Sequence, residues 1–421
     1  MARWLKRDSS LGFAVQSSGY TVAETTGFTY LLAGDDVSVD LARENQAIQL
    51  LEGVAGANSA PLAGSKHGGK VKFKVPLRGC KVAYDPTSTI VGNTPPEFAL
   101  MAIALGSGVA NAPFTSAYVA AACDTGATYT SVPTTAGTFV PGQFFVSDSD
   151  GLGGNLATGW VKSKSGTPAT LVLHDATMYR PASGDNIYPT ATACLTTTQP
   201  SPLTIRYVGT SGLGYVLVGC VCESATISAG ARQVPVLELS YTFTSHTRDA
   251  TIGGMQVPVG YERVAPSISS KGSRLLVAGA VKDGVADLKI DYKATLAFVD
   301  SHNALQGVSE CVVTSKTVKI TCSIPIDSLD TLTNGSSPYE TSLETGATIG
   351  GICLTTGTMP GKICSIFAPA VRVSAQPKLT DKGGFLCEQL EFEAAAYTSD
   401  GTSTTTVDAS PADTVFRVAL A

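Results

Sequence analysis

The residues best suited to chemistry are carboxylates that recur at even spacings in three extended segments. They are Asp36, Asp40 and Glu44 in the first, Asp287 and Asp291 in the second, and Glu391 and Glu393 in the third. Side chains an even number of residues apart lie on one face of a strand. Such a face is either simply solvated or repels a sliding polyanion, since like charge removes the counterion release that holds DNA on a surface. Lys289 and Lys293 share the second face and make it mixed.

The sequence contains little that is typical of an enzyme's active site. No nucleophile elbow, zinc-protease motif, phosphate-binding loop or dinucleotide fingerprint occurs. The four histidines, His67, His174, His246 and His302, stand far apart in the sequence. Residues 148–155 match part of the pattern of a calcium-binding loop but lack its third carboxylate and its terminal Glu. A hairpin turn is therefore the better interpretation of this segment. We therefore expect no enzyme, no metal and no cofactor; a glycan hydrolase with paired carboxylates is the enzymatic alternative.

The ten cysteines include no C-x-x-C pair, and no histidine lies near the two thiols of Cys220 and Cys222. This spacing favours buried free thiols over disulfides and disfavours a zinc site. Asp8 follows the basic N-terminal residues where a secretory signal would need an apolar stretch. We therefore expect synthesis in a cytoplasm.

The chain repeats itself once. Residues 30–34 match residues 275–279, and residues 71–75 match residues 318–322 at an offset of 247. Farther along, Val221 matches Val371 at an offset of only 150, and residues 239–241 match residues 390–392 at 151. The first copy therefore carries about 97 residues that the second lacks. Two copies of one fold, one of them with an inserted domain, are typical of a ring subunit that supplies two pseudo-equivalent positions.

Composition predicts a mainly β fold with few helices. The chain holds 43 Gly and 22 Pro, and only 15% of its residues are charged, which favours short strands joined by turns. Residues 98–105 are the one convincing helix of the first half, stopped by Gly106; residues 327–332 offer the only counterpart in the second. The net charge of −5 argues against tight nucleic-acid binding. The longest apolar runs are too short for the ~20 residues of a membrane helix.

Several segments resemble the major tail tube proteins of long-tailed, non-contractile bacteriophages, in a form with a duplicated tube domain. In the first copy these are residues 69–79, from Gly69 through the alternating Lys70, Lys72 and Lys74 to Gly79, and residues 95–101. In the second copy they are residues 371–374, 390–397 and 413–419. The resemblance spans about three fifths of the chain and leaves residues 110–202 unmatched.

This resemblance implies two tandem tail-tube-like β-sandwich domains, each with at most one short helix, plus an inserted small β-domain. The expected parts are an N-terminal arm at 1–26, a first tube domain at 27–109 and 203–248, an inserted domain at 110–202 on the outer surface, and a second tube domain at 249–421. Duplication implies trimeric rings with pseudo-sixfold symmetry, stacked into a hollow tube. The carboxylates named above would then face the lumen.

The resemblance also implies where the chain works and what it contacts. It would be a virion protein of the phage tail, made in the bacterial host cytoplasm, with tail terminator, tail tip and tape measure proteins as partners and no membrane. DNA would pass through without tight binding. The Gly-rich loop 46–66 would order between rings, with Gln46, Leu50, Leu51, Glu52, Leu62 and Lys66 as candidate contacts, and the arm would do the same.

One different kind of structural protein remains open from the sequence. A pilus, sheath or capsid-surface subunit would also self-assemble, and its inserted domain would then bind the partner. An assembly without a hollow tube would distinguish this alternative.

Overall fold

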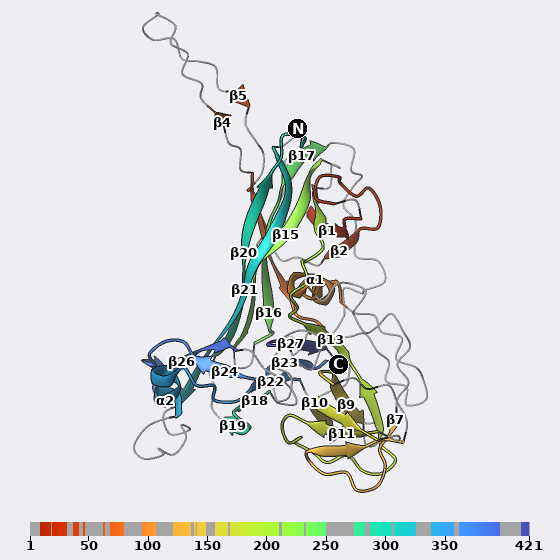
Figure 1. Cartoon of the computed structure of the whole chain (residues 1–421), viewed down its shortest axis with the longest axis vertical. Helices are drawn as coiled ribbons and strands as arrows, with labels where there is room; N and C mark the ends of the chain where they lie inside the picture. Colours follow the sequence, from red (N-terminus) through yellow and green to blue (C-terminus); the bar gives the residue numbers. More distant parts are fainter. Residues whose placement is uncertain are drawn as a thin grey trace, which may run out of the picture.

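The computed structural model is mainly β; the part of the chain that it describes contains two helices and several antiparallel sheets (Figure 1). This confirms the fold class expected from composition. The structure describes residues 9–17, 19–31, 37–41, 45–46, 62–63, 68–79, 95–106, 121–135, 139, 141–148, 156–166, 169–209, 213–230, 233–249, 273–282, 287–304, 307–325, 338–357, 362–395 and 414–420.

The largest sheet contains one strand order twice. The first block runs β3 (Ser38–Asp40), β6 (Lys70–Pro76), β16 (Val236–Thr242) and β15 (Gly214–Gly230). The second runs β20 (Asp287–Asp300), β21 (Val308–Pro325), β26 (Phe385–Ala394) and then, along one edge, β24 (Val371–Val373) and β25 (Lys378–Lys382). Strands β15 and β20 pair directly, so the two blocks form one continuous sheet.

Strand β15 belongs to two ladders because it bends at Gly219. Its first half pairs with β14 (Leu203–Gly209) and β17 (Ser245–Asp249), and its second half pairs with β16 and β20. Gly219 has φ +65, and its N–H donates to Gln16 Oε1 at 2.8 Å. A Cβ there would collide with Thr244 and with the carbonyl of Tyr20. The bend therefore needs glycine.

Part of the expected N-terminal arm is a strand of the chain's own sheet. Strand β1 (Ser9–Val15) lies between β14 and β2 (Thr29–Leu31) and buries Leu11 and Phe13. The idea that residues 1–26 order only against a neighbour is wrong for this strand, because Leu11 and Phe13 fill the core of the same chain. Residues 1–8 lie outside the described part.

Two further sheets hold the second copy's outer layer and the insertion. One runs β13 (Ala191–Cys194), β27 (Arg417–Leu420), β23 (Cys364–Ala368), β22 (Ile352–Thr356), β18 (Arg274–Val277) and β19 (Ala280–Lys282). The other runs β7 (Ala121–Ala122), β12 (Asn186–Pro189), β9 (Phe144–Asp148), β10 (Ala157–Ser165), β11 (Thr170–Leu173) and β8 (Ser131–Pro133). Strand β13 falls inside the predicted insertion 110–202 and pairs with the C-terminal strand β27.

The expected loop 46–66 is described only at its two ends. Strands β4 (Asn45–Gln46) and β5 (Leu62–Ala63) pair with each other in a separate two-stranded ladder, with Gln46 opposite Leu62. Figure 1 shows this ladder set apart from the main sheet. Leu50, Leu51, Glu52 and Lys66 lie outside the described residues.

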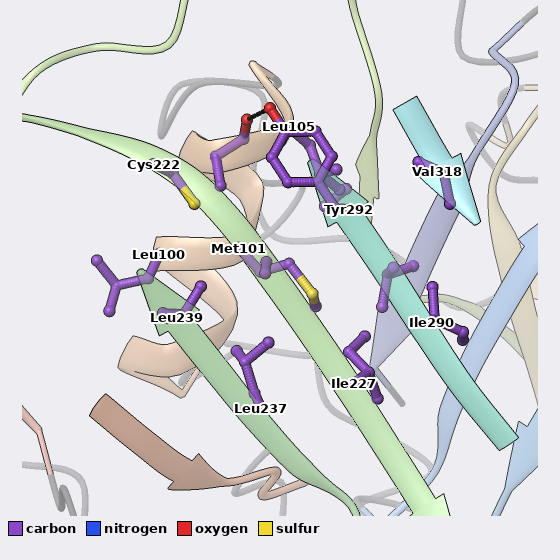
Figure 2. Packing of buried hydrophobic residues seen from close by; sticks show 14 of the residues in the cluster. Leu100, Met101, Leu105, Cys222, Ile227, Leu237, Leu239, Ile290, Tyr292 and Val318 are labelled. Atoms are coloured by element: carbon purple, nitrogen blue, oxygen red, sulfur yellow. Dashed lines mark hydrogen bonds between the residues drawn. The ribbon is translucent and has the colours of Figure 1, made fainter. Parts of the chain in front are cut away.

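Helix α1 (Pro96–Leu105) fills the core behind the main sheet. Pro95 and Pro96 begin it, and Gly106 ends it in the left-handed conformation at φ 84. Leu100, Met101 and Leu105 point toward side chains of β15, β16 and β20, and Tyr292 of β20 donates to the Ala104 carbonyl at 2.9 Å (Figure 2). Burying such residues stabilises the fold by about 1.5–3 kcal/mol each.

A buried ion pair fixes the start of this helix. Arg78 donates to both carboxylate oxygens of Glu97, at 2.6 and 2.7 Å, and the two side chains are 4% and 1% exposed. The second helix, α2 (Pro338–Thr345), packs Tyr339 edge-on against Phe392 of β26. The expected site for this helix, residues 327–332, lies outside the described residues; Pro338, a favoured residue in a first turn, is the signal that marks α2 in the sequence.

The inserted sheet docks on the second copy, although the first copy carries it. Trp160 of β10 stacks on Phe367 of β23 with centroids 5.5 Å apart, and its Nε1 donates to Ser365 Oγ at 2.9 Å. His174 packs on the same Phe367 ring at 4.8 Å, and the Arg417 guanidinium lies 5.5 Å from its centroid. These contacts close a small separate core at the interface.

The segment that leaves the insertion is tied to the main sheet. Lys316 Nζ on β21 donates to the carbonyls of Thr196 and Thr198 at 2.6 and 2.8 Å. Gln199 forms two hydrogen bonds with the backbone of Val313, at 2.8 and 2.9 Å. A strand of the second copy therefore holds the exit of the first copy's insertion.

Replacing Gly219 by Ala tests the bend. A non-glycine residue in the left-handed region costs about 1–2 kcal/mol, and the collision with Thr244 adds to it, so we expect a loss of at least about 2 kcal/mol of unfolding free energy. Gly19 is the matched control, with φ +83 and no atom within 4 Å of an added Cβ. Denaturant unfolding should show only this backbone cost of about 1–2 kcal/mol for Gly19→Ala; a loss for Gly219→Ala no larger than that of Gly19→Ala would contradict the role of the bend.

The docking of the insertion should weaken in acid. Burial, then Arg417 and Lys162, lowers the pKa of His174 to about 3. The unfolded chain protonates His174 below about pH 6.5 and the folded chain does not, so stability is complete above that pH and falls by at most about 1.4 kcal/mol per pH unit down to about pH 3. His174→Gln should flatten this slope in unfolding measurements between pH 7 and 5. The exposed His302→Gln is the control, and a parallel effect of both variants would refute the assignment.

Candidate functional site: the charged face of the main sheet

The candidate site is the charged face of the main sheet, the side opposite α1. Apolar residues point into the core at alternate positions, as Val71, Phe73 and Val75 do in β6 and Leu288, Ile290 and Tyr292 do in β20. The residues between them must therefore point to the other side. These are lysines in β6 and alternating acids and lysines in β20, so the alternation that builds the core also builds the charged face.

Register aligns these side chains into rows that cross the strands. One row crosses seven strands through directly opposed residues: Lys74, Glu238, Thr226, Asp291, Lys319, Glu393 and Arg372. Bases and acids alternate along it, with Thr226 donating to Asp291 Oδ1 at 2.6 Å in the middle. Opposite charges on opposed residues are favourable, whereas like charges would be destabilising.

Each of the four acids that the sequence singles out in the second block has a basic partner in the structure. Lys289 Nζ lies 2.8 Å from Asp291, Arg372 Nη2 lies 3.1 Å from Glu393, Lys378 Nζ lies 3.7 Å from Glu391, and Lys382 Nζ lies 2.5 Å from Asp287. In the first block, Lys70 pairs with Glu223 at 2.7 Å and Lys74 with Glu238 at 3.6 Å. Charge on this face is therefore compensated locally.

The structure brings together five of the seven carboxylates singled out in the sequence. Asp40, Asp287, Asp291, Glu391 and Glu393 lie on this one face, on strands β3, β20 and β26. Asp36 and Glu44 lie outside the described residues. The face is not an acidic lining, because the lysines foreseen at 289 and 293 are joined by many others.

Sequence reasoning missed the bases that complete this face. Lys70, Lys72 and Lys74 were visible as an alternating strand, and Glu238 alternates with Leu237 and Leu239 in the same way. Arg372, Lys378 and Lys382 carried no such signal, because their partners lie on β26 and β20 and only the register reveals them.

Other chemistry is sparse in the described part of the chain. No cluster of three or more His, Cys, Asp or Glu there is arranged to hold a metal ion. The nine cysteines within it are free and buried, and burial raises the pKa of Cys322 and Cys353 to about 12, so these thiols stay protonated at neutral pH. Within the same residues, no helix combines the length and apolar character needed to cross a bilayer.

The histidines do not meet on this face. His174 lies at the insertion interface, His246 on β17 packs edge-on against Phe243, and His302 is exposed in the turn after β20. His67 lies outside the described residues, as do Asp150 and the rest of the calcium-like run after Asp148. Comparison with protein-family models and with curated proteins finds no match for this sequence.

Removing one carboxylate charge should matter far more inside the core than on this face. Glu97→Gln leaves the buried Arg78 without its anion and should cost about 3–5 kcal/mol of unfolding free energy. Glu393→Gln breaks a pair whose Arg372 side chain is 50% exposed and should cost no more than about 1 kcal/mol. Denaturant unfolding of both variants measures the difference, and a loss above about 2 kcal/mol for Glu393→Gln would show that the rows act cooperatively.

Proposed function

We propose that this chain is a structural virion protein of a phage tail. Three copies form a pseudo-hexameric ring, and stacked rings form a hollow tube through which DNA passes. The chain acts as a scaffold and not as an enzyme. The charged face of the main sheet lines the lumen.

The observation that carries this proposal is the direct pairing of β15 with β20. Residues 224–230 of the first block pair antiparallel with residues 287–293 of the second. Two blocks with the same strand order thus already stand side by side as neighbours in a ring would. A single chain holds one third of a closed circuit if the same junction repeats between chains.

Strand geometry gives a sensible diameter for that circuit. Eight strands per chain and three chains make about 24 strands, which at ~4.8 Å spacing and ~40° tilt close on a backbone diameter of roughly 45–50 Å. Side chains reduce the opening to about 35–40 Å, wide enough for a DNA duplex. Closure also removes the exposed edges of a sheet that is otherwise prone to nonspecific pairing.

Local compensation of charge suits a surface that DNA passes without binding. Lysines paired with carboxylates, such as Lys70 with Glu223 and Lys289 with Asp291, release few counterions on meeting phosphate. Unpaired lysines would hold the polyanion, and a purely acidic face would raise a barrier to its entry. Alternating rows do neither.

The position of the insertion fits the outside of such a tube. It packs on β22, β23 and β27 through Trp160 and Phe144, and the sheet that these strands form packs on the core side of the main sheet, away from the charged face. With the charged face in the lumen, the insertion faces outward. There it is available to other virion components or to the environment.

One observation favours the alternative of another self-assembling subunit whose insertion binds a partner. Tyr129 and Met178 on the insertion are 53% and 60% exposed, and Thr177 donates to the Tyr129 carbonyl, which joins the two loops that carry them. An exposed aromatic and a methionine on ordered loops are typical of contact surfaces. The form of the assembly decides between the two functions.

Assembly of the purified protein tests the proposal. Concentrated protein should form hollow tubes in negative-stain electron micrographs, with three chains per ring by mass per length, because each chain supplies two of six pseudo-equivalent positions. Solid fibrils or flat sheets would favour the alternative subunit. Permanently monomeric protein that unfolds cooperatively would contradict self-assembly altogether.

A further inference from the structure

The pairing of β15 with β20 inside the chain indicates how the sheet of one chain would pair with the sheet of the next. The edge of β26 that carries β24 and β25 corresponds to the edge of β16 that carries β15, because residues 239–241 of β16 match residues 390–392 of β26 and Val221 of β15 matches Val371 of β24. Strand β15 has β20 on its far side. Among the described residues no strand pairs with the far side of β24 and β25, or with the far side of β3.

The sequence offsets between the two repeats identify which residues of two copies would lie opposite each other in the junction between chains. Thr380 lies 150 residues after Gly230, and Asp40 lies 247 residues before Asp287. Gly230 and Asp287 are directly opposed in the β15–β20 ladder. The equivalent pair between two copies is therefore Thr380 with Asp40.

The charges of the two edges are complementary in that register. Lys378, Thr380 and Lys382 alternate along β25, with Lys378 opposite Gln389, so they follow the charged face. Asp40 lies on the same face of β3, opposite Lys70. A partner's Asp40 opposite Thr380 would be diagonal to both lysines, within the distance at which cross-strand pairs interact.

An exposed apolar residue points to the same register. Leu379 is 65% exposed, and burying its side chain against a partner would be favourable. Its counterpart in the first block, Ala229, is opposed to Leu288 of β20. The same offsets set Leu379 opposite Leu41, a partly buried residue already packed at the core.

We infer that the β24–β25 edge of one copy binds the β3 edge of a second copy in antiparallel register, with Thr380 opposite Asp40 and Leu379 opposite Leu41. This inference rests on the proposed ring and names its contact. The junction is shorter than the internal one, since β3 spans three residues whereas the β15–β20 ladder pairs seven. Rings should therefore open between chains and not within them.

Cysteine cross-linking tests the register. Thr380→Cys protein is mixed with Asp40→Cys protein under assembly conditions and oxidised, and covalent dimers should form. The control replaces Asp40→Cys by Ser38→Cys, two residues along β3. Because Cα atoms more than about 7 Å apart are not bridged, we expect about tenfold less dimer in the control. Native cysteines add little background, since the nine described ones are buried.

The double variant Thr380→Cys with Asp40→Cys adds a second readout. It should give a ladder of covalent products that ends at a trimer, because the third junction closes the ring. Tubes that form without the Thr380–Asp40 cross-link, or with a stronger Ser38 cross-link, would overturn the register and leave the proposed tube intact. Absence of any assembly by the unmodified protein would overturn both.

Discussion

The antiparallel pairing of β15 with β20 is the constraint on which the rest of the structure depends. It converts two repeats into one sheet, so the apolar face of that sheet is continuous and α1 can pack across the seam, with Tyr292 of β20 bonded to the helix end. It also makes the charged face continuous, since the row from Lys74 to Arg372 crosses this seam at Thr226 and Asp291. A break at the seam would split both the core and the charged face.

Different segments of the chain pack behind the two blocks of the main sheet. Behind the first block, residues 19–28 lie over β14, where Arg206 stacks over Phe28 at 3.9 Å and Glu24 N–H donates to Thr204 Oγ1 at 3.0 Å. Behind the second block, the insertion covers the equivalent strands through Trp160 and Phe367. A segment of the first copy itself covers the first block, and the inserted domain covers the second.

The sequence predicts the strands of the main sheet well, because each alternates apolar and charged residues, as Val71 to Val75 and Leu288 to Tyr292 do. It also predicts α1 from Pro95, Pro96 and Gly106. It cannot predict which strands become neighbours, so the partners of Arg372 and Lys382 and the role of β1 stay hidden until register is known. The docking of Trp160 on Phe367, 207 residues away, has no local signal at all.

The insertion's attachment has an evolutionary consequence. It is encoded within the first repeat, yet its Trp160 and Phe144 complete the core of the second, and β13 extends the second repeat's sheet. Neither half of the gene therefore specifies a complete domain. Once such an insertion had settled on its neighbour, the two repeats could no longer separate into independent folding units, because each would leave part of this shared core exposed.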